Sequence, residues 1–152
     1  MDDMANDSLR ISSDKRALDI DMIHAFLRDH AYWSKGIPKE TVERAIEGSL
    51  CFGGYVGDKQ VAFARLVTDM ATFAYLCDVF VLPEYRGHGY GRALMGHIFE
   101  SHLLTGLRRI LLVTSDAHEL YRPFGFQALG SPEKFMEIAR PGIYSASRDA
   151  AS

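Results

Sequence analysis

The spacing of apolar residues changes part of the way along the chain. In the first third, apolar side chains recur at helical intervals, as at Ile20, Ile23 and Leu27, and Asp19 stands where a helix N-cap is expected. After Gly48 the pattern becomes short apolar runs rich in β-favouring residues and separated by turn-like segments, which is typical of strands joined by hairpins. The sequence therefore predicts a mixed α+β fold, with a central sheet and helices on both faces.

The expected elements follow one another without an internal repeat. They are a strand at 9–12, a helix from Ile20 to about His30, a second helix from Pro38 to Gly48, strands at 50–56, 61–68 and 72–82, a long helix through Leu94 that Gly106 stops, a strand at 109–114, a short helix at 117–121, and a final pair of strands at 126–129 and 135–139. A chain of 152 residues, 47% of them hydrophobic, is the size of one domain, so residues 1–152 are expected to form a single domain with flexible ends at 1–7 and 145–152.

The composition narrows the range of partners. A net charge of −3 and a pI near 6.0 argue against general affinity for nucleic acid or anionic membrane, which usually requires a strongly basic face. The N-terminus shows no basic-then-apolar signal, and no apolar stretch reaches about eighteen residues. Cys51 and Cys77 lie in apolar runs and are expected to be small buried hydrophobes. We therefore expect a soluble cytoplasmic protein that acts on a small molecule.

A glycine-rich segment between a predicted strand and a predicted helix carries the clearest chemistry. Gly87, Gly89 and Gly91 remove the side chains that would keep a backbone away from a ligand, and the unpaired N–H groups of a helix N-terminus follow at once. Arg86 and Arg92 add positive charge to the positive end of the helix dipole. The segment is therefore expected to bind an anion such as a pyrophosphate.

The order of these glycines decides between ligand classes. The dinucleotide fingerprint requires Gly-x-Gly-x-x-Gly, and the Walker pattern ends in Gly-Lys-Ser/Thr, whereas this chain reads Arg86-Gly87-x-Gly89-x-Gly91. That order resembles the Arg/Gln-x-x-Gly-x-Gly/Ala signature of the GNAT superfamily of acyl-CoA-dependent N-acyltransferases. The later segment 117–126, which reads Ala-x-x-Leu-Tyr-x-x-Phe-Gly-Phe, resembles the late helix and strand of the same superfamily. The resemblance covers residues 8 to 142.

The resemblance implies a mostly antiparallel, splayed sheet and acetyl-CoA as cosubstrate. The backbone of Val79, Phe80 and Val81 would pair with the pantetheine arm, and an amide near Phe80 or Val81 would stabilise the oxyanion. The pyrophosphate would lie on the loop, made of Arg86, Gly87, His88, Gly89, Tyr90, Gly91 and Arg92. Many members carry an asparagine contact to pantetheine at the position where this chain reads Thr114-Ser115-Asp116, so Thr114 or Ser115 is the expected substitute.

Acetyl transfer requires an acid and a base. Tyr121 matches the family position that faces the CoA sulfur, and a phenol can donate a proton to the departing thiolate; the alternative is a core tyrosine packed against Phe124 and Phe126. For the base we select Asp78, an acid inside an apolar run. The alternative is that this carboxylate is hydrogen-bonded and has only a structural role. The weaker candidates are Asp69, in a turn, and His118 and Glu119, on the short helix.

The acceptor pocket is the least defined part of the site. By resemblance it lies between the first two helices, their connection and the late strands, which brings in His24, Tyr32, Trp33, Phe52, Arg65, Tyr75 and Tyr144. Arg65 would bind an acceptor carboxylate or form a salt bridge with Asp69 or Asp78. An amino acid, a polyamine, an aminoglycoside and a protein N-terminus all stay open as acceptors.

Three classes of function remain in view. The first is an N-acetyltransferase that acts on a primary amine of a small molecule by direct attack, without a metal, because the six histidines show no ligand spacing. The second is a non-catalytic acyl-CoA sensor or regulatory module. The third is a nucleotide-binding domain of another type, which would prefer NAD or ATP. A homodimer stays open, since small domains of this type often pair through exposed strands or helices.

Overall fold

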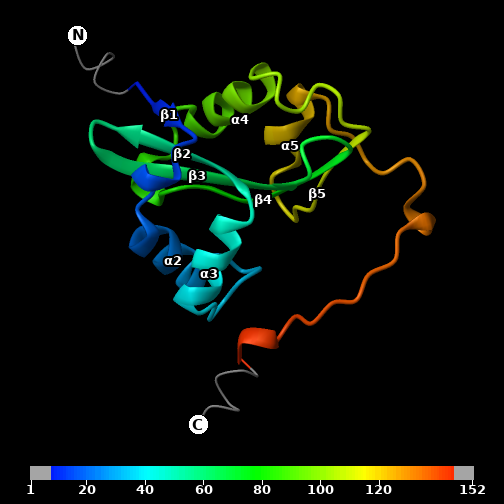
Figure 1. Ribbon diagram of the computed structural model, residues 1–152, viewed down its shortest axis with the longest axis horizontal. Helices are drawn as coiled ribbons and strands as arrows, with labels where there is room; N and C mark the ends of the chain where they lie inside the picture. Colours follow the sequence, from blue (N-terminus) through cyan, green and yellow to red (C-terminus); the bar gives the residue numbers. More distant parts are fainter. Residues whose placement is uncertain (1–7, 146–152) are drawn as a thin grey trace.

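A five-stranded sheet with helices on both faces forms the body of the protein in the computed structural model, which describes residues 8–145 (Figure 1). The strands are β1 (Arg10–Ser12), β2 (Leu50–Val56), β3 (Lys59–Thr68), β4 (Phe73–Val81) and β5 (Arg109–Leu112), in spatial order β1-β2-β3-β4-β5. The helices are α2 (Ile20–Asp29), α3 (Lys39–Glu47), α4 (Tyr90–Glu100) and α5 (His118–Tyr121). The ends predicted to be flexible were 1–7 and 145–152; of these, residues 1–7 and 146–152 lie outside the described residues.

The two N-terminal helices cover one face of the sheet (Figure 1). The Asp19 carboxylate accepts a hydrogen bond from the Met22 N–H at 3.1 Å and caps α2, as predicted. The apolar stripes of α2 and α3 meet the sheet in one cluster, which contains Ile23, Phe26, Leu27, Val42, Ile46, Phe63 and Phe80. No helix in the described part of the chain is long and apolar enough to cross a membrane.

The opposite face carries α4 and α5. Leu94, Met95 and Ile98 of α4 are almost completely buried against the sheet, and Tyr121 of α5 belongs to the same cluster. Helical spacing of the apolar residues of α4 is what allows one face of the helix to be buried. The prediction of helices on both faces is therefore confirmed.

The sheet is antiparallel from β1 to β4, and only β4 and β5 run parallel. The ladder between β3 and β4 is interrupted, because Arg65 pairs with Cys77 but Phe63 pairs with Phe80. Two residues of β4 therefore lie opposite one residue of β3, and the first of them, Asp78, has a φ of 52°. This is a β-bulge, which bends its strand and changes the direction of neighbouring side chains.

Three predicted elements differ from the structure. The helix that was expected to continue to Gly106 ends at Glu100, because His102 adopts a left-handed φ of 66° that cannot continue a right-handed helix. The predicted strands at 126–129 and 135–139 are wrong: among the described residues, neither segment belongs to the sheet. A 3-10 turn at Pro132–Lys134 leads the chain away from β5, which remains the edge strand.

Candidate functional site

The glycine loop forms an open cradle at the N-terminus of α4. Gly87 and Gly89 adopt left-handed φ angles of 87° and 79°, which only glycine adopts without strain, and a side chain built on either would meet no atom within 4 Å. Gly89 is the N-cap residue of α4 and supplies no side-chain cap. The cavity here has a volume of about 290 Å³ and is lined by Val81, Tyr85, Arg86, Gly87, Gly89, Tyr90, Gly91, Arg92 and Leu120. Its shape and its position at the N-terminus of a helix suit an anion.

The side chains of the loop differ in their surroundings. The Nε of Arg86 donates a hydrogen bond to the Val81 carbonyl at 2.9 Å, which ties the loop to the end of β4. Arg92 is exposed and lines the cavity. His88 is exposed too, but its ring lies beside that of the buried Tyr90, with centroids 5.5 Å apart, and it does not line the cavity.

β4 and β5 separate next to this cradle. They pair only between Phe73–Leu76 and Arg109–Leu112, so the second half of β4 has no strand on its β5 side within the described chain. The bulge at Asp78 lies in this second half. Phe80 keeps its side chain in the core, stacked on Phe26 with centroids 4.0 Å apart, while its backbone lies in the separated part of the strand. The binding role predicted for Val79, Phe80 and Val81 stays a prediction.

Tyr121 is buried near both the cradle and the split. Only 8% of its surface is exposed, its ring stands edge-on to Phe126, and burial raises its pKa to about 12. A side chain at Gly91 would lie 3.6 Å from Leu120, so α5 packs directly on the first turn of α4. Tyr121 is therefore a protonated phenol at neutral pH, adjacent in sequence to a residue that lines the cradle.

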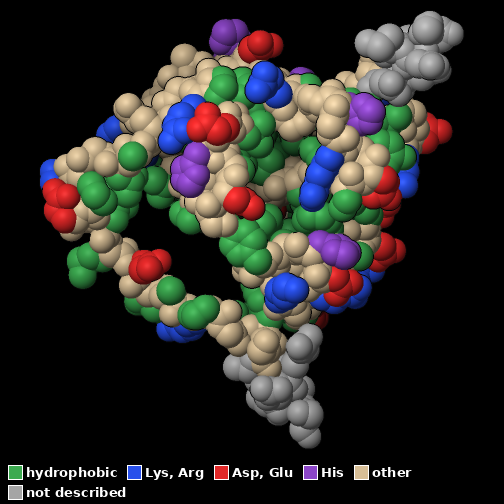
Figure 2. Space-filling model, turned by 180° about the vertical axis from the view of Figure 1, so that it is seen from behind, with side chains coloured by type: hydrophobic (Ala, Val, Ile, Leu, Met, Phe, Trp, Pro, Cys, Tyr) green, Lys and Arg blue, Asp and Glu red, His purple; other side chains and the backbone are tan. Residues whose placement is uncertain are grey.

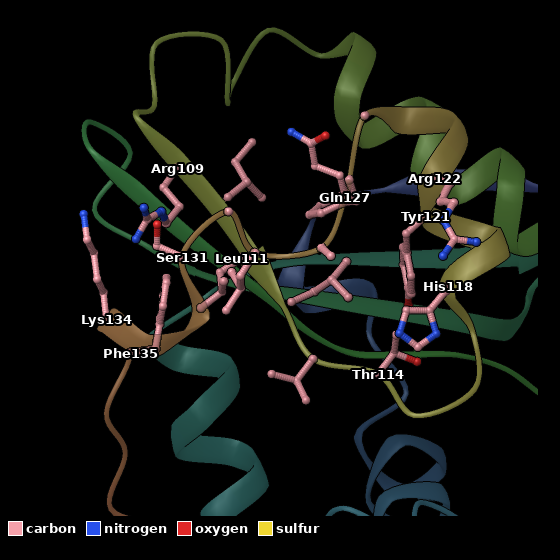
Figure 3. Close-up of a pocket in the computed structure, with 18 of the residues that line it drawn as sticks. Arg109, Leu111, Thr114, His118, Tyr121, Arg122, Gln127, Ser131, Lys134 and Phe135 are labelled. Carbon is pink, nitrogen blue, oxygen red and sulfur yellow. The ribbon is translucent and has the colours of Figure 1, made fainter.

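A second, larger cavity lies on the outer side of β5. Its volume is about 960 Å³, and it extends from Thr114, His118 and Tyr121 to Lys134 and Phe135 (Figure 3). The Thr114 hydroxyl accepts a hydrogen bond from the Ala117 N–H at 3.0 Å and so supports the start of α5. Because this cavity lacks glycine amides at a helix N-terminus, we assign the anion site to the smaller cradle.

Asp78 is the centre of a polar cluster on β4, in the half of the strand that is separated from β5. Its two carboxylate oxygens accept hydrogen bonds from the Trp33 Nε1 at 2.8 Å and the Arg65 Nε at 2.9 Å. Arg65 also donates to the Ser49 hydroxyl at 2.9 Å. Burial alone would lower the pKa of Arg65, but the charge and hydrogen bond of Asp78, together with the neighbouring Cys77 and Cys51, raise it overall. The predicted salt bridge of Arg65 is thus made with Asp78; the Asp69 carboxylate accepts from the backbone of its own turn.

The linker between α2 and α3 spans the split. The Tyr32 hydroxyl lies 2.9 Å from the Ser115 hydroxyl, beyond the end of β5, while the neighbouring Trp33 holds Asp78 on β4. The two rings of the linker stand edge to face, with centroids 5.0 Å apart. Ser115 lies in the segment that the sequence analysis marked for a pantetheine contact, and here it contacts Tyr32. Ser49 escaped the sequence analysis because no motif marks it; the pairing of Cys51 with Arg65 is the register that brings Ser49 close.

The other candidate residues lie further from the split or are used elsewhere. His24 contacts the Ile37 carbonyl at 2.9 Å, Phe52 is fully buried under α4, and Tyr144 packs against the cluster under α2 and α3. Tyr75 is half-buried, and burial raises its pKa. Glu119 is exposed and forms an ion pair with Arg122. Among residues 8–145, no group of three or more His, Cys, Asp or Glu side chains could hold a metal ion.

Known proteins resemble this chain in sequence and in fold. The sequence profile described as "Acetyltransferase (GNAT) family" matches residues 20–126. A Gibberella zeae protein named as an acetyltransferase is 34% identical over 133 residues, which cover 73% of this chain and 74% of the relative. A structure from Xanthomonas campestris pv. campestris, assigned to the GNAT family, is 52% identical, with a TM-score of 0.88 over 91% of this chain and 97% of its own.

A more distant structure shares the fold alone. It comes from Clostridium acetobutylicum, is described as an acetyltransferase with acetyl-CoA, and is 16% identical, with a TM-score of 0.60 over 87% of this chain and 95% of its own. The profile match includes the split strands, the glycine loop and Tyr121, and GNAT enzymes use acetyl-CoA. The chain belongs to the GNAT family of acetyltransferases.

Proposed function

We propose that this enzyme transfers the acetyl group of acetyl-CoA to a primary amine of a small molecule by direct attack, with Tyr121 as general acid. The observation that carries the proposal is the open cradle at Gly87 and Gly89, which leads directly to the separated half of β4. The cradle suits the pyrophosphate of CoA, and the unpaired strand edge suits an extended pantetheine chain. Arg86 and Arg92 supply the positive charge.

The reaction requires one bond to form and one to break. The amine nitrogen attacks the thioester carbonyl, a C–N bond forms, and the C–S bond breaks as the thiolate leaves. A backbone N–H near Phe80 or Val81 stabilises the negative charge on the carbonyl oxygen in the transition state. Tyr121 then gives its proton to the thiolate; its pKa, raised to about 12 by burial, keeps the donor protonated at neutral pH.

The proton lost by the amine needs an acceptor, and Asp78 is our candidate. Trp33 and Arg65 each use one acceptor position, on different carboxylate oxygens, so that each oxygen keeps a second position for an amine or a bridging water. The same contacts support the structural alternative, in which Asp78 only fixes Trp33. If Asp78 is the base, Asp78→Asn changes the pH–rate profile; an unaltered profile excludes it.

The acceptor is proposed to enter beside the linker of α2 and α3. Tyr32 and Trp33 are 57% and 45% exposed, although both are large aromatic residues, and they lie over the split. Exposed aromatic rings at the mouth of a site offer apolar contact and attract cationic groups to their faces. An aliphatic or aromatic amine of small size fits this surface better than a polyanion, in agreement with the net charge of −3.

The competing candidate is a module that binds acyl-CoA without turnover. Release of CoA thiol from acetyl-CoA, measured with a broad panel of primary amines, separates the two. Acceptor-dependent release supports the enzyme, and tight binding without release on any amine supports the module. Tyr121→Phe should lower turnover by about tenfold or more and leave CoA affinity nearly unchanged, because it removes only the proton. Unchanged turnover would remove Tyr121 from the mechanism.

A further inference from the structure

The face of the sheet under α2 and α3 opens beyond Arg65. Side chains along a strand alternate between its two faces, so Phe63, Arg65 and Val67 of β3 point to the same side. Phe63 belongs to the cluster under α2 and α3 and is fully buried, Arg65 is partly buried, and Val67 is 43% exposed. Residues 135–144 end on the same cluster, and Figure 2 shows an opening between this segment and the body. The cover of this face therefore ends at Arg65, and a small molecule can reach the surface beyond it.

The side chains beyond Arg65 form an apolar surface. Tyr75 of β4 pairs with Val67 of β3, so the two side chains lie next to each other on this face. The exposed ring of Trp33 borders them, because its Nε1 donates to Asp78 on the same strand as Tyr75. We call the surface made by Val67, Tyr75 and Trp33 the apolar floor. It ends at the ion pair of Arg65 and Asp78.

The guanidinium of Arg65 keeps hydrogen-bond donors for a ligand. Its Nε donates to Asp78 and its Nη1 donates to Ser49, each at 2.9 Å. Its Nη2 donates to no residue in the described part of the chain. No buried side-chain nitrogen or oxygen of the described residues lacks a partner, so Nη2 is accessible to solvent. A ligand that reaches the apolar floor can therefore accept hydrogen bonds from Nη2 and from the second N–H of Nη1.

The ion pair of Asp78 and Arg65 is complementary to an α-amino acid. The carboxylate and the guanidinium lie side by side, with 2.9 Å between Oδ2 and Nε. An α-amino acid carries an amine and a carboxylate on one carbon, so its carboxylate can meet the guanidinium while its amine lies at Asp78. A phosphate dianion suits the site less well, because the negative charge of Asp78 stands beside the same guanidinium.

We propose that the acceptor is an α-amino acid with an apolar or aromatic side chain, whose carboxylate binds the guanidinium of Arg65. Its side chain lies on the apolar floor, and its amine lies between Asp78 and the thioester. This inference rests on the acetyl transfer proposed above and names its acceptor. The C–N bond forms at the α-amine, the C–S bond of acetyl-CoA breaks, and the products are an N-acetyl amino acid, CoA thiol and the proton that Asp78 passes to solvent. Arg65 is then a specificity-determining residue.

The first test compares acceptors that differ only in the carboxylate. The pairs are phenylalanine with phenethylamine, tryptophan with tryptamine, and leucine with isopentylamine. In at least one pair, kcat/KM for release of CoA thiol should be about tenfold or more higher for the amino acid, because the amine leaves the guanidinium without its partner. Arg65→Lys should lower this ratio by about tenfold, since an ammonium keeps the charge but lacks the planar pair of donors. Arg10→Lys is the matched control, because Arg10 is exposed on the edge strand β1.

The ratio separates specificity from damage to the site. Both members of a pair are measured on the same variant, so a general effect of Arg65→Lys on the fold or on Asp78 acts on both and leaves the ratio unchanged. A second measurement needs no turnover. Isothermal titration calorimetry on the enzyme loaded with CoA should detect the preferred amino acid more strongly than its amine, and Arg65→Lys should weaken the binding of the amino acid by about tenfold.

The outcomes distinguish this inference from the proposed function. If the amines release CoA thiol as fast as the amino acids in all three pairs, or if phosphoethanolamine is preferred to every amino acid, the amino-acid acceptor is refuted and acetyl transfer stands. An unchanged ratio in Arg65→Lys would likewise refute the role of Arg65. Binding of an amino acid without release of thiol on any acceptor would refute acetyl transfer and leave the carboxylate site standing. Neither binding nor release would refute both.

Discussion

Replacement of Gly89 by alanine tests whether the cradle binds acetyl-CoA. An L-residue in the left-handed region is destabilised by about 1–2 kcal/mol, and alanine recovers about 0.4–1 kcal/mol because it restricts the unfolded chain. Since the new Cβ would meet no atom within 4 Å, no clash adds to this, and the net loss is about 1 kcal/mol. For a chain of this size, the melting temperature should fall by about 2–4 °C.

The affinity for acetyl-CoA should fall as well, for a reason separate from this loss of stability. The methyl group of Gly89→Ala would project into the open space that a pyrophosphate requires, and we expect the Kd for acetyl-CoA to rise by about tenfold or more, which corresponds to about 1.4 kcal/mol. Isothermal titration calorimetry measures it directly. A ligand concentration above the Kd should also raise the melting temperature of the wild type, and raise that of the variant less.

Gly57→Ala is the matched control. Gly57 lies in the β2–β3 turn, has a φ of 60°, and also meets no atom within 4 Å of an added Cβ. It should lose the same stability as Gly89→Ala and keep the affinity for acetyl-CoA. If Gly89→Ala binds acetyl-CoA as tightly as Gly57→Ala does, the cradle does not hold the pyrophosphate.

Three further predictions follow from single side chains. Cys51 and Cys77 should react with a thiol reagent at pH 7 only after unfolding, because burial raises both pKa values; fast modification of the native protein would contradict this. Asp69 has a lowered pKa, mainly from the backbone N–H groups of its turn, so Asp69→Ala should lower the melting temperature at pH 7, and the difference should shrink as the pH falls below about 3.9; a difference that persists unchanged in acid is the opposing result. Arg65→Leu leaves Asp78 without its ion pair and should destabilise the fold by roughly 2 kcal/mol in urea unfolding, whereas a neutral effect would show that solvent replaces the pair.

Local patterns predicted the elements whose causes are local. The helix after Asp19 and the strand Leu50–Val56 have the predicted positions, since capping and the period of apolar residues are contained in a few neighbouring residues. The end of α4 was missed because no residue pattern before Gly106 marks the left-handed φ of His102. The strands at 126–129 and 135–139 failed for a different reason: a strand needs a partner, and the run of apolar residues does not say where that partner is.

The candidate site also has parts that the sequence predicted and parts that it could not predict. The glycine loop could be predicted because glycine at fixed spacing specifies backbone conformation. The contacts of Asp78 could not, because Trp33 is 45 residues away in the sequence and its indole reaches the carboxylate only through the linker of α2 and α3. The alternatives for Arg65 stayed open until the register of β3 and β4 was known.

The bridge made by Tyr32 and Trp33 has a mechanical consequence. These adjacent residues make contacts on opposite sides of the gap between β4 and β5. Tyr32 contacts Ser115, beyond the end of β5, and Trp33 donates to Asp78 on β4. A molecule that pushes the linker aside must release both ties together, since two neighbours on one short backbone cannot travel separately. Entry of a ligand from this side would therefore break the contacts to Ser115 and Asp78 in one movement, and its departure would let both contacts form again.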